Sequence, residues 1–132
     1  MANESTNSQD KKVLIIEDDK DFLWILRQSF EAAGLTVIYA QDGEEGLQKA
    51  QSENPALLLV DIGLPKMDGI AVAKALRGKG VEAPIIFLTN MKDMDHISEA
   101  LEAGGGGADY IVKSDVQIDA IVDRVKNKLG MQ

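Results

Sequence analysis

The chain has 132 residues, 45% of them hydrophobic, and a formal net charge of −8. A chain of this length forms one hydrophobic core of ordinary size, so we expect a single domain over residues 12–130. The acidic balance, without a long basic run, argues against direct binding of nucleic acid or of an anionic membrane surface. Because the sequence contains no cysteine, a disulfide framework and a thiolate metal site are both excluded.

Residues 1–11 are polar and lack the apolar segment of a signal peptide. This composition is typical of a disordered N-terminal tail. No stretch of the chain approaches the length of a transmembrane helix. We therefore expect a soluble, cytoplasmic protein.

Five short apolar runs alternate with five helical patterns along the chain. The runs are rich in Val, Ile and Leu, which is typical of strands buried on both faces, and they span residues 13–16, 36–40, 56–60, 84–88 and 109–112. The helical patterns have apolar residues three and four positions apart, and they span residues 21–33, 43–53, 69–78, 94–103 and 115–129.

Two of these helices carry more specific predictions. The only tryptophan, Trp24, lies opposite the apolar stripe of the first helix, so we expect it to be exposed. Ser114–Gln117 ("SDVQ") fits a capping box for the last helix. The stripe of the first helix that is predicted to face the core consists of Phe22, Ile25, Leu26, Phe30 and Ala33.

Strands that alternate with helices through right-handed crossovers form a parallel sheet covered on both faces. The predicted fold class is therefore α/β, a doubly wound (βα)5 sandwich. In such sheets the ligand site lies at the carboxyl ends of the strands. The side chains expected there are Glu17, Asp18 and Asp19 after the first strand, Asp61 at the end of the third, Thr89 at the end of the fourth and Lys113 at the end of the fifth.

This set of side chains is suited to phosphoryl transfer. Carboxylates packed together repel one another, and a hard cation such as Mg²⁺ relieves the repulsion. An aspartate that remains free can act as a nucleophile and carry a phosphoryl group. The phosphoryl oxygens then need a cationic side chain and a hydroxyl donor in addition to the metal. Asp61, Lys113 and Thr89 meet these needs.

Four sequence blocks resemble those of response-regulator receiver domains, the phosphoacceptor halves of bacterial two-component systems. The blocks are VLIIEDD, LLLVDIGLPKMDG, PIIFLTN and ADYIVKS, and the resemblance covers residues 12–129. It implies a flavodoxin-like and CheY-like sheet of five parallel strands in the order 2-1-3-4-5. Because the chain ends soon after the last helix, we expect a stand-alone receiver without an output domain.

The resemblance also implies roles for single residues. Asp61 would accept a phosphoryl group from a histidine kinase or a phosphotransfer protein. Lys113 would contact that group, and Thr89 would bond it after phosphorylation. Tyr110 would be an aromatic switch residue. The ligands of Mg²⁺ or Mn²⁺ would be Glu17, Asp18, Asp61 and the backbone carbonyl of Gly63.

The output implied by the resemblance is a change of surface. Phosphorylation would alter the face formed by helix 94–103, strand 109–112 and helix 115–129. Its partner would be a protein, and a phosphorylation-dependent homodimer is one form of that output. The protein would not be an enzyme for other substrates, since it would promote only its own phosphorylation and dephosphorylation.

Other readings of these residues stay open. Asp61 alone could be a turn former, and we expect Asp19 or Asp21 to cap the first helix.

A pseudo-receiver, which binds partners without phosphorylation, is the main alternative. It is favoured by Asn90, where receivers usually carry Ala or Ser, and by Ser114, where they usually carry a Pro after a cis bond. Without Pro a cis bond costs about 3 kcal/mol, so either that strain is retained or the loop differs. A flavin or nucleotide binder fits less well, because acids follow the first strand where a phosphate-cradling loop would be needed.

Three further features have structural and functional interpretations. Trp24 is either a contact for a kinase, a phosphotransfer domain or a second copy, or a residue exposed without function. The only histidine, His96, is expected to be a solvated surface residue rather than a phosphoryl carrier. Gly104–Gly107 follows a helix and precedes a strand, so it should be a helix C-cap and a turn at the end of the sheet away from the carboxylates.

Overall fold

The computed structural model describes residues 12–131, so the tail expected at residues 1–11 lies outside the described residues. A sheet of five parallel strands has the order β2-β1-β3-β4-β5, which confirms the predicted architecture. The strands are β1 (Lys12–Ile16), β2 (Thr36–Ala40), β3 (Leu57–Val60), β4 (Ile85–Thr89) and β5 (Asp109–Val112).

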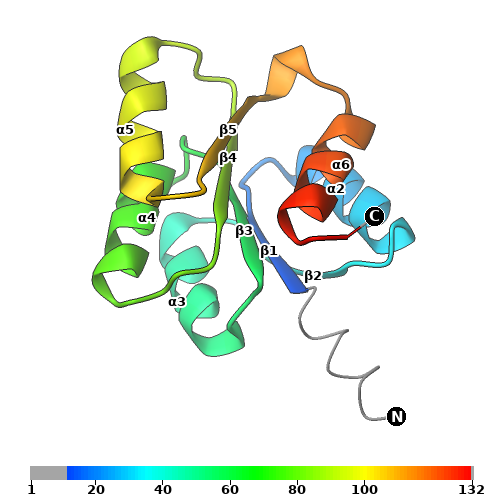
Figure 1. Cartoon of the computed structure of the whole chain (residues 1–132), viewed down its shortest axis with the longest axis horizontal. Coiled ribbons are helices and arrows are strands. Elements are labelled where there is room, and N and C mark those ends of the chain that lie inside the picture. Colours follow the sequence, from blue (N-terminus) through cyan, green and yellow to red (C-terminus); the bar gives the residue numbers. More distant parts are fainter. Residues whose placement is uncertain (1–11, 132) are drawn as a thin grey trace.

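Helices cover both faces of this sheet (Figure 1). On one face lie α2 (Lys20–Ala32) and α6 (Ile118–Lys128), and on the other lie α3 (Gly43–Glu53), α4 (Gly69–Gly78) and α5 (Met94–Gly104). A short 3₁₀ helix, η1 (Lys113–Asp115), follows β5. Among residues 12–131, no helix is both long and apolar enough to cross a membrane.

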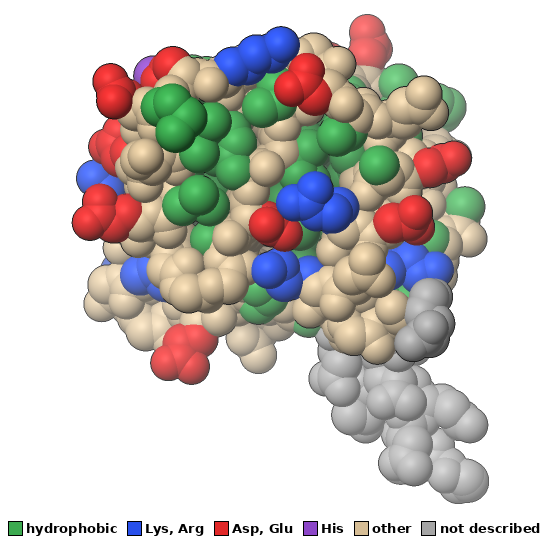
Figure 2. All heavy atoms as spheres, turned by 45° about the horizontal axis from the view of Figure 1, so that its top comes forward, with side chains coloured by type: hydrophobic (Ala, Val, Ile, Leu, Met, Phe, Trp, Pro, Cys, Tyr) green, Lys and Arg blue, Asp and Glu red, His purple; other side chains and the backbone are tan. Residues whose placement is uncertain are grey.

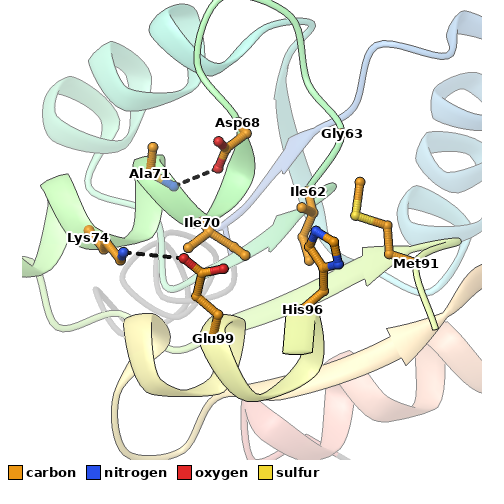
Figure 3. Close-up of a pocket in the computed structure, with 9 residues that line it drawn as sticks. All are labelled: Ile62, Gly63, Asp68, Ile70, Ala71, Lys74, Met91, His96 and Glu99. Carbon is orange, nitrogen blue, oxygen red and sulfur yellow. Dashed lines mark hydrogen bonds and ion pairs between the residues drawn. The ribbon is translucent and has the colours of Figure 1, made fainter. Parts of the chain in front are cut away.

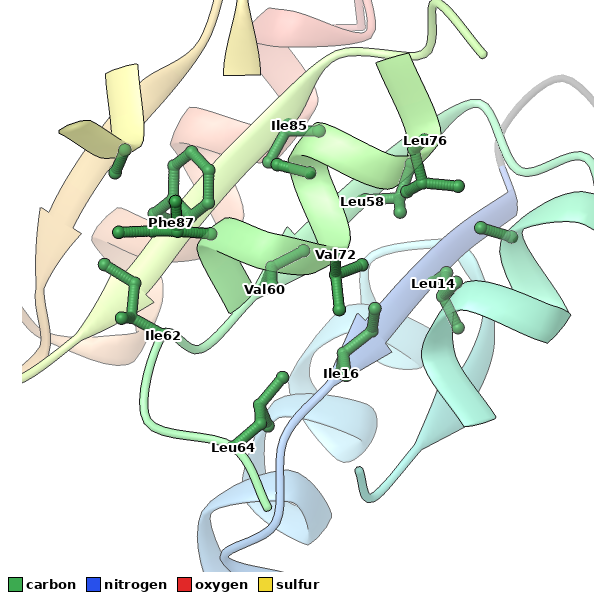
Figure 4. Close-up of a cluster of buried hydrophobic side chains, with 14 of the residues drawn as sticks. Leu14, Ile16, Leu58, Val60, Ile62, Leu64, Val72, Leu76, Ile85 and Phe87 are labelled. Atoms are coloured by element: carbon green, nitrogen blue, oxygen red, sulfur yellow. The ribbon is translucent and has the colours of Figure 1, made fainter. Parts of the chain in front are cut away.

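The inner strands supply most of the core, because they are covered by helices on both sides. Every residue of β3 and β4 is buried, as is every residue of β1 after Lys12. Figure 4 shows the cluster between the sheet and α4, where Val72 and Leu76 lie near strand residues such as Leu58 and Val60. The expectation of strands buried on both faces is wrong for the two edge strands, where β2 and β5 keep one flank open and are only partly buried.

The buried stripe of α2 is rotated relative to the prediction. The buried residues are Leu23, Leu26 and Phe30, whereas Ile25 is 41% exposed. Asp19 is the N-cap, and its carboxylate accepts from the backbone N–H groups of Asp21 and Phe22, so the helix begins at Lys20. Because this helix is rich in apolar residues, its periodicity is compatible with two neighbouring apolar stripes facing the core. The stripe that contains Leu23 is the one buried, because α2 packs against α6.

The prediction for the last helix is wrong at its N-terminus. Lys113–Asp115 forms the 3₁₀ turn, and α6 begins at Ile118, three residues later than expected. Gln117 is the N-cap and its side chain makes no capping hydrogen bond, so the expected capping box of Ser114–Gln117 does not form. Val116 and Gln117 have extended backbone conformations, with φ angles of −135° and −95°, so the α-helix cannot begin before Ile118.

The glycine run forms the connector that the sequence predicts, and its backbone is anchored. Gly104 ends α5, and Gly105 and Gly107 have positive φ angles of 79° and 86°, which favour glycine. Arg77, near the end of α4, donates from Nε and Nη2 to Gly104 O over 2.8 and 2.6 Å. Its Nη1 donates to Val81 O and Ala83 O over 2.8 and 2.9 Å. One guanidinium thus joins the end of α5 to the segment that enters β4.

Arg77→Met is expected to lower the free energy of unfolding by about 2–3 kcal/mol, because it leaves three half-buried carbonyls without their charged donor. Arg77→Lys should recover only part of this loss, since an ammonium cannot donate in several directions as the planar fork does. Urea unfolding measures both changes. The matched control is Lys74→Met on the same helix, whose exposed pair with Glu99 spans 3.5 Å and should contribute less than about 1 kcal/mol. Equal stability of Arg77→Met and Lys74→Met would contradict the role of Arg77.

Candidate functional site

The structure brings the predicted site residues to the carboxyl edge of the sheet. β1 and β3 are paired neighbours with Ile16 opposite Val60. Immediately beyond them, the backbone N–H of Asp61 donates to Ile16 O over 3.0 Å. Glu17 continues β1, and its N–H donates to Ala40 O over 2.9 Å. The ladder therefore fixes the backbone of both acids.

Three carboxylates converge at this point. Glu17, Asp18 and Asp61 each offer an oxygen, and these oxygens all lie within 4.8 Å of one another. Asp61 is only 8% exposed and Glu17 is buried, whereas Asp18 is exposed. Asp19 stands apart from this group as the helix cap, although its backbone N–H donates to Glu17 Oε2 over 3.0 Å. Such a set of acidic oxygens, one of them open to solvent, suits a hard divalent cation.

Lys113 is the cation that balances the buried pair. Its Nζ lies 2.8 Å from Glu17 Oε1 and 3.0 Å from Asp61 Oδ2. Burial acts to lower the pKa of Lys113, but its hydrogen bond to Glu17 and the charge of Asp61 outweigh burial and raise it. The ammonium therefore remains charged at neutral pH. The other oxygen of Asp61, Oδ1, accepts from the backbone N–H of Gly63 over 3.2 Å.

Glu17 is the carboxylate whose negative charge is destabilised by this environment. Burial raises its pKa from 4.5 to about 7, and the charge of Asp61 adds to the rise. The hydrogen bonds from Lys113 and from the backbone of Asp19 oppose this change without cancelling it. Lys113 alone therefore does not neutralise the negative charge of the carboxylates. A divalent cation bound among them would reduce the repulsion between them.

Thr89 and Tyr110 lie on the two strands beside this cluster. Thr89 is the last residue of β4 and is buried. Tyr110 is half-buried in β5, and its hydroxyl donates to the backbone carbonyl of Met91 over 2.7 Å. The ring of Tyr110 also lies 6.4 Å from that of Phe87, measured between centroids. The predicted switch tyrosine is thus bonded to the loop that follows Thr89.

The comparisons with known proteins agree with this geometry. The sequence matches the model of the response regulator receiver domain over residues 13–126. The chain belongs to this family. The receiver is 41% identical over 103 residues to the alkaline phosphatase synthesis transcriptional regulatory protein PhoP of Bacillus subtilis. It is 36% identical over 115 residues to the transcriptional regulatory protein PrrA of Mycobacterium tuberculosis.

Solved receiver domains share the fold of this receiver over most of its length. The receiver domain of the Francisella response regulator 1452 gives a TM-score of 0.83 at 30% identity, covering 91% of this chain and 97% of that one. A CheY-like receiver domain protein from Methanospirillum hungatei gives 0.83 at 31% identity, with 91% and 94% covered. The two curated relatives are longer: the matches cover 78% and 87% of this chain but 42% and 48% of theirs, so the chain spans about half their length.

Ser114 and Asn90, the two residues that depart from the usual receiver pattern beside the site, have defined positions in the structure. No peptide bond is cis among residues 12–131, so the bond between Lys113 and Ser114 is trans and the loop continues into η1. Asn90 directly follows Thr89 and is exposed. The Lys113 ammonium reaches Asp61 in this trans loop, so the acid and lysine contact of the receiver does not require a proline.

A cavity of about 270 Å³ adjoins the site of the receiver without containing its carboxylates. It is lined by the loop after β3, by α4, by the loop after β4 and by α5 (Figure 3). Lys74 and Glu99 pair across it over 3.5 Å, and His96 also faces it. His96 is half-exposed, as a surface residue should be, and its Nδ1 lies 2.7 Å from both carboxylate oxygens of Asp93.

Because His96 pairs with Asp93, its contribution to the stability of the folded state should depend on pH. The hydrogen bond to Asp93 raises the pKa of His96 above its ordinary 6.5, and the charges of Asp93, Glu99 and Asp95 add to the rise. The pair therefore favours the folded state fully below pH 6.5, and this contribution is lost as pH rises through the higher pKa of the folded state. NMR titration of the only histidine measures that pKa directly.

Asp93→Asn is the matched variant for this titration. Asp93 also caps α5 by accepting from the backbone N–H of His96 over 2.9 Å, and Asn caps helices as well as Asp does. The variant should therefore keep the helix and bring the pKa of His96 down toward 6.5. An unchanged pKa in Asp93→Asn would show that the pair does not form in solution.

The surface around the site is mixed in charge. Figure 2 shows acidic and basic side chains interspersed with hydrophobic ones on the face that comes forward. On α2, Trp24 is 60% exposed, which confirms the prediction from its position opposite the apolar stripe.

One contact of the receiver site was missed by reasoning from sequence. The ring of Phe22 lies against the Lys113 ammonium, with Nζ 4.7 Å from the ring centroid. The apolar pattern placed Phe22 among residues that face the core. Its position in the first turn of the helix, soon after the acids, placed Phe22 near the site but did not indicate Lys113 as its partner.

Proposed function

We propose that the domain is a phosphoacceptor that takes a phosphoryl group onto Asp61 from a phosphohistidine donor, either a histidine kinase or a phosphotransfer protein. The observation that carries the proposal is the position of Asp61. It is buried at the carboxyl end of β3, inside an acidic cluster and 3.0 Å from Lys113. An aspartate with this environment, in a member of the receiver family, is a nucleophile rather than a turn former.

The transfer is a substitution at phosphorus. A carboxylate oxygen of Asp61 forms the new O–P bond while the P–N bond to the donor imidazole breaks, and the electron pair of that bond stays on the imidazole nitrogen. With a small acyl phosphate, the bond that breaks joins phosphorus to the acyl oxygen and a carboxylate leaves. Lys113 stabilises the charge on the phosphoryl oxygens, and Thr89 donates a hydroxyl hydrogen bond to them after transfer.

The acidic cluster fits the metal that this chemistry uses. Glu17, Asp18, Asp61 and the backbone carbonyl of Gly63 would hold Mg²⁺, or Mn²⁺ in its place. The cation would neutralise charge on the phosphoryl oxygens. We propose that the domain promotes only its own phosphorylation and dephosphorylation and acts on no other substrate.

The proposed output is a change on the face formed by α5, β5 and α6. When Thr89 turns toward the phosphoryl group, the space it leaves admits the ring of Tyr110, which must then give up its bond to Met91 O. The curated relatives are named transcriptional regulators. For this acidic domain, with a net charge of −8, we propose a protein partner or a homodimer rather than nucleic acid as the contact of this face.

Mass spectrometry after incubation with Mg²⁺ and acetyl phosphate tests the proposal. We expect one added phosphoryl group on the wild type and none on Asp61→Asn, which preserves the shape of the side chain but lacks its charge. The adduct should also be lost when EDTA removes the metal. A wild type that takes up no phosphoryl group under these conditions would favour the pseudo-receiver, a binding module that works without phosphorylation.

We also propose that Trp24 contacts the protein donor. Trp24 is 60% exposed on the helix that Asp19 caps beside the site, and exposed tryptophans are enriched among residues that dominate binding energy. Trp24→Ala should slow phosphotransfer from a protein donor about tenfold and leave phosphorylation by acetyl phosphate unchanged. Parallel assays with the two donors measure the difference. Unchanged transfer from the protein donor, together with unchanged self-association in sedimentation velocity, would exclude the contact.

A further inference from the structure

Phe22 packs against the lysine at the centre of the site. The centroid of its ring is 4.7 Å from Lys113 Nζ, a distance at which a cation is attracted to the face of an aromatic ring. The backbone N–H of Phe22 donates to Asp19 Oδ1 over 3.2 Å, within the first turn of α2. The half-buried side chain also packs against the core between the sheet and α6. The helix and the core therefore both fix the ring in place.

Lys113 needs such support because it directly follows β5, at the edge of the sheet, and its partners follow β1 and β3. β4 separates β5 from β3, and both β3 and β4 separate β5 from β1. The lysine side chain must extend across this distance to reach Asp61 and Glu17. Holding a long, flexible side chain in one conformation costs rotamer entropy, which contacts at its end must offset. Those contacts are the two ion pairs, to Glu17 and Asp61, and the ring of Phe22.

These contacts differ in how they respond to a metal ion. Glu17 and Asp61 both belong to the acidic cluster, so a divalent cation bound there competes with Lys113 for the same carboxylates. The ring of Phe22 has no ligand atom for Mg²⁺ and no proton to lose. Its attraction for the ammonium therefore persists when the ion pairs weaken.

We propose that Phe22 is a positioning residue that keeps the Lys113 ammonium beside Asp61 while the carboxylates bind their metal. The inference rests on the proposed phosphoacceptor function and adds a residue to it. The ring acts through its negative face and also excludes water from one side of the amine, whose side chain is only 14% exposed. Leucine at this position would keep much of the packing and remove the ring face, whereas tyrosine would keep both.

NMR tests the contact independently of phosphorylation. Protons above an aromatic face are shifted upfield, so the ε-methylene protons of Lys113 should be upfield of those of exposed lysines. The shift should persist when Mg²⁺ is added to the wild type. It should vanish in Phe22→Leu and be retained in Phe22→Tyr. Ile25→Leu, three positions along the same helix and 41% exposed, is the matched control and should leave the shift unchanged.

The rate of phosphorylation by acetyl phosphate at saturating Mg²⁺ tests the consequence. Phe22→Leu should react about three- to tenfold more slowly than the wild type, as expected from the loss of one cation–π contact. Phe22→Tyr and Ile25→Leu should react at the rate of the wild type. A merely structural role would slow Phe22→Leu only in proportion to its unfolded fraction, which circular dichroism measures.

The outcomes separate this inference from the proposed function. An ε-methylene shift that is the same in Phe22→Leu and the wild type would overturn the contact, even if the wild type is phosphorylated. A lost shift with an unchanged rate would overturn the positioning role. A wild type that takes up no phosphoryl group would overturn the proposed function and the positioning role together, while the NMR result still decides whether ring and ammonium meet.

Discussion

Lys113→Met is expected to destabilise the protein by about 3 kcal/mol at pH 7, because it leaves two buried carboxylates without their cation. In the folded protein, Nζ of this lysine lies 2.8 Å from Glu17 Oε1 and 3.0 Å from Asp61 Oδ2. Phosphorylation of the variant by acetyl phosphate with Mg²⁺ should be about 100-fold slower, the typical effect of removing one fixed group that stabilises the charge of a transition state. Urea unfolding and mass spectrometry of quenched samples measure the two losses.

The loss of stability should depend on pH in a defined direction. Burial raises the pKa of Glu17 from 4.5 to about 7, so the folded protein holds a proton there that the unfolded chain releases at lower pH. This contribution favours folding below pH 4.5 and is lost as pH rises through about 7. At pH 5 Glu17 is neutral in the folded state and needs no cation. The destabilisation by Lys113→Met should therefore be smaller at pH 5 than at pH 7.

Lys92→Met is the matched control for this substitution. Lys92 follows β4 at the same edge of the sheet, and its Nζ lies 3.4 Å from Asp115 Oδ1. Both side chains of this pair are exposed, so removing the lysine should change the free energy of unfolding by less than about 1 kcal/mol. If Lys113→Met were no more destabilising than Lys92→Met, the ion pairs of Lys113 would contribute nothing to stability.

The sequence was sufficient to predict the sheet and the acids at its edge. Parallel strands end at a common edge, so acids that end the first and third runs must meet once those strands are neighbours. Glu17, Asp18 and Asp61 meet in this way. The alternation of strands and helices placed each polar residue at the carboxyl edge of the sheet, and the resemblance to receiver domains supplied the strand order that makes β1 and β3 neighbours.

Contacts that are not reflected in the hydrophobic periodicity of the sequence could not be predicted. Arg77 bonds carbonyls of Gly104, Val81 and Ala83, and a backbone acceptor has no sequence identity that would indicate such a contact. The pairing of Phe22 with Lys113 joins residues far apart in the chain, and hydrophobicity alone assigned the ring to the core. In α2 the choice between Leu23 and Ile25 depended on where α6 packs, which is a tertiary effect.

Gly69 is the glycine whose replacement should disturb the site most directly. It is the first residue of α4, and its N–H donates to Ile62 O over 2.9 Å. A Cβ at this position would lie 2.1 Å from the backbone carbonyl oxygen of Asp61 and 2.9 Å from the carbonyl carbon of the same residue. These atoms belong to the backbone that carries the proposed nucleophile, and they cannot turn away as a flexible side chain can.

Gly69→Ala is therefore expected to lower the free energy of unfolding by about 2–3 kcal/mol, the cost of forcing extra volume into a packed site. The same displacement of the Asp61 backbone should slow phosphorylation by acetyl phosphate at saturating Mg²⁺ about tenfold or more, because small errors in the position of a reacting group are costly. Urea unfolding and the rate of adduct formation measure the two effects in one preparation.

Gly78→Ala, at the other end of the same helix, separates steric displacement from helix propensity. A Cβ at Gly78 would meet no atom within 4 Å, and alanine favours a helix over glycine by about 1 kcal/mol. This control should therefore be as stable as the wild type or more stable, and it should be phosphorylated at the same rate. The two variants make the same chemical change in one helix, so opposite effects on stability would show that the carbonyl of Asp61 is pressed directly against the start of α4. A Gly69→Ala protein as stable as Gly78→Ala, phosphorylated at the rate of the wild type, would show that the contact is looser than 2.1 Å implies.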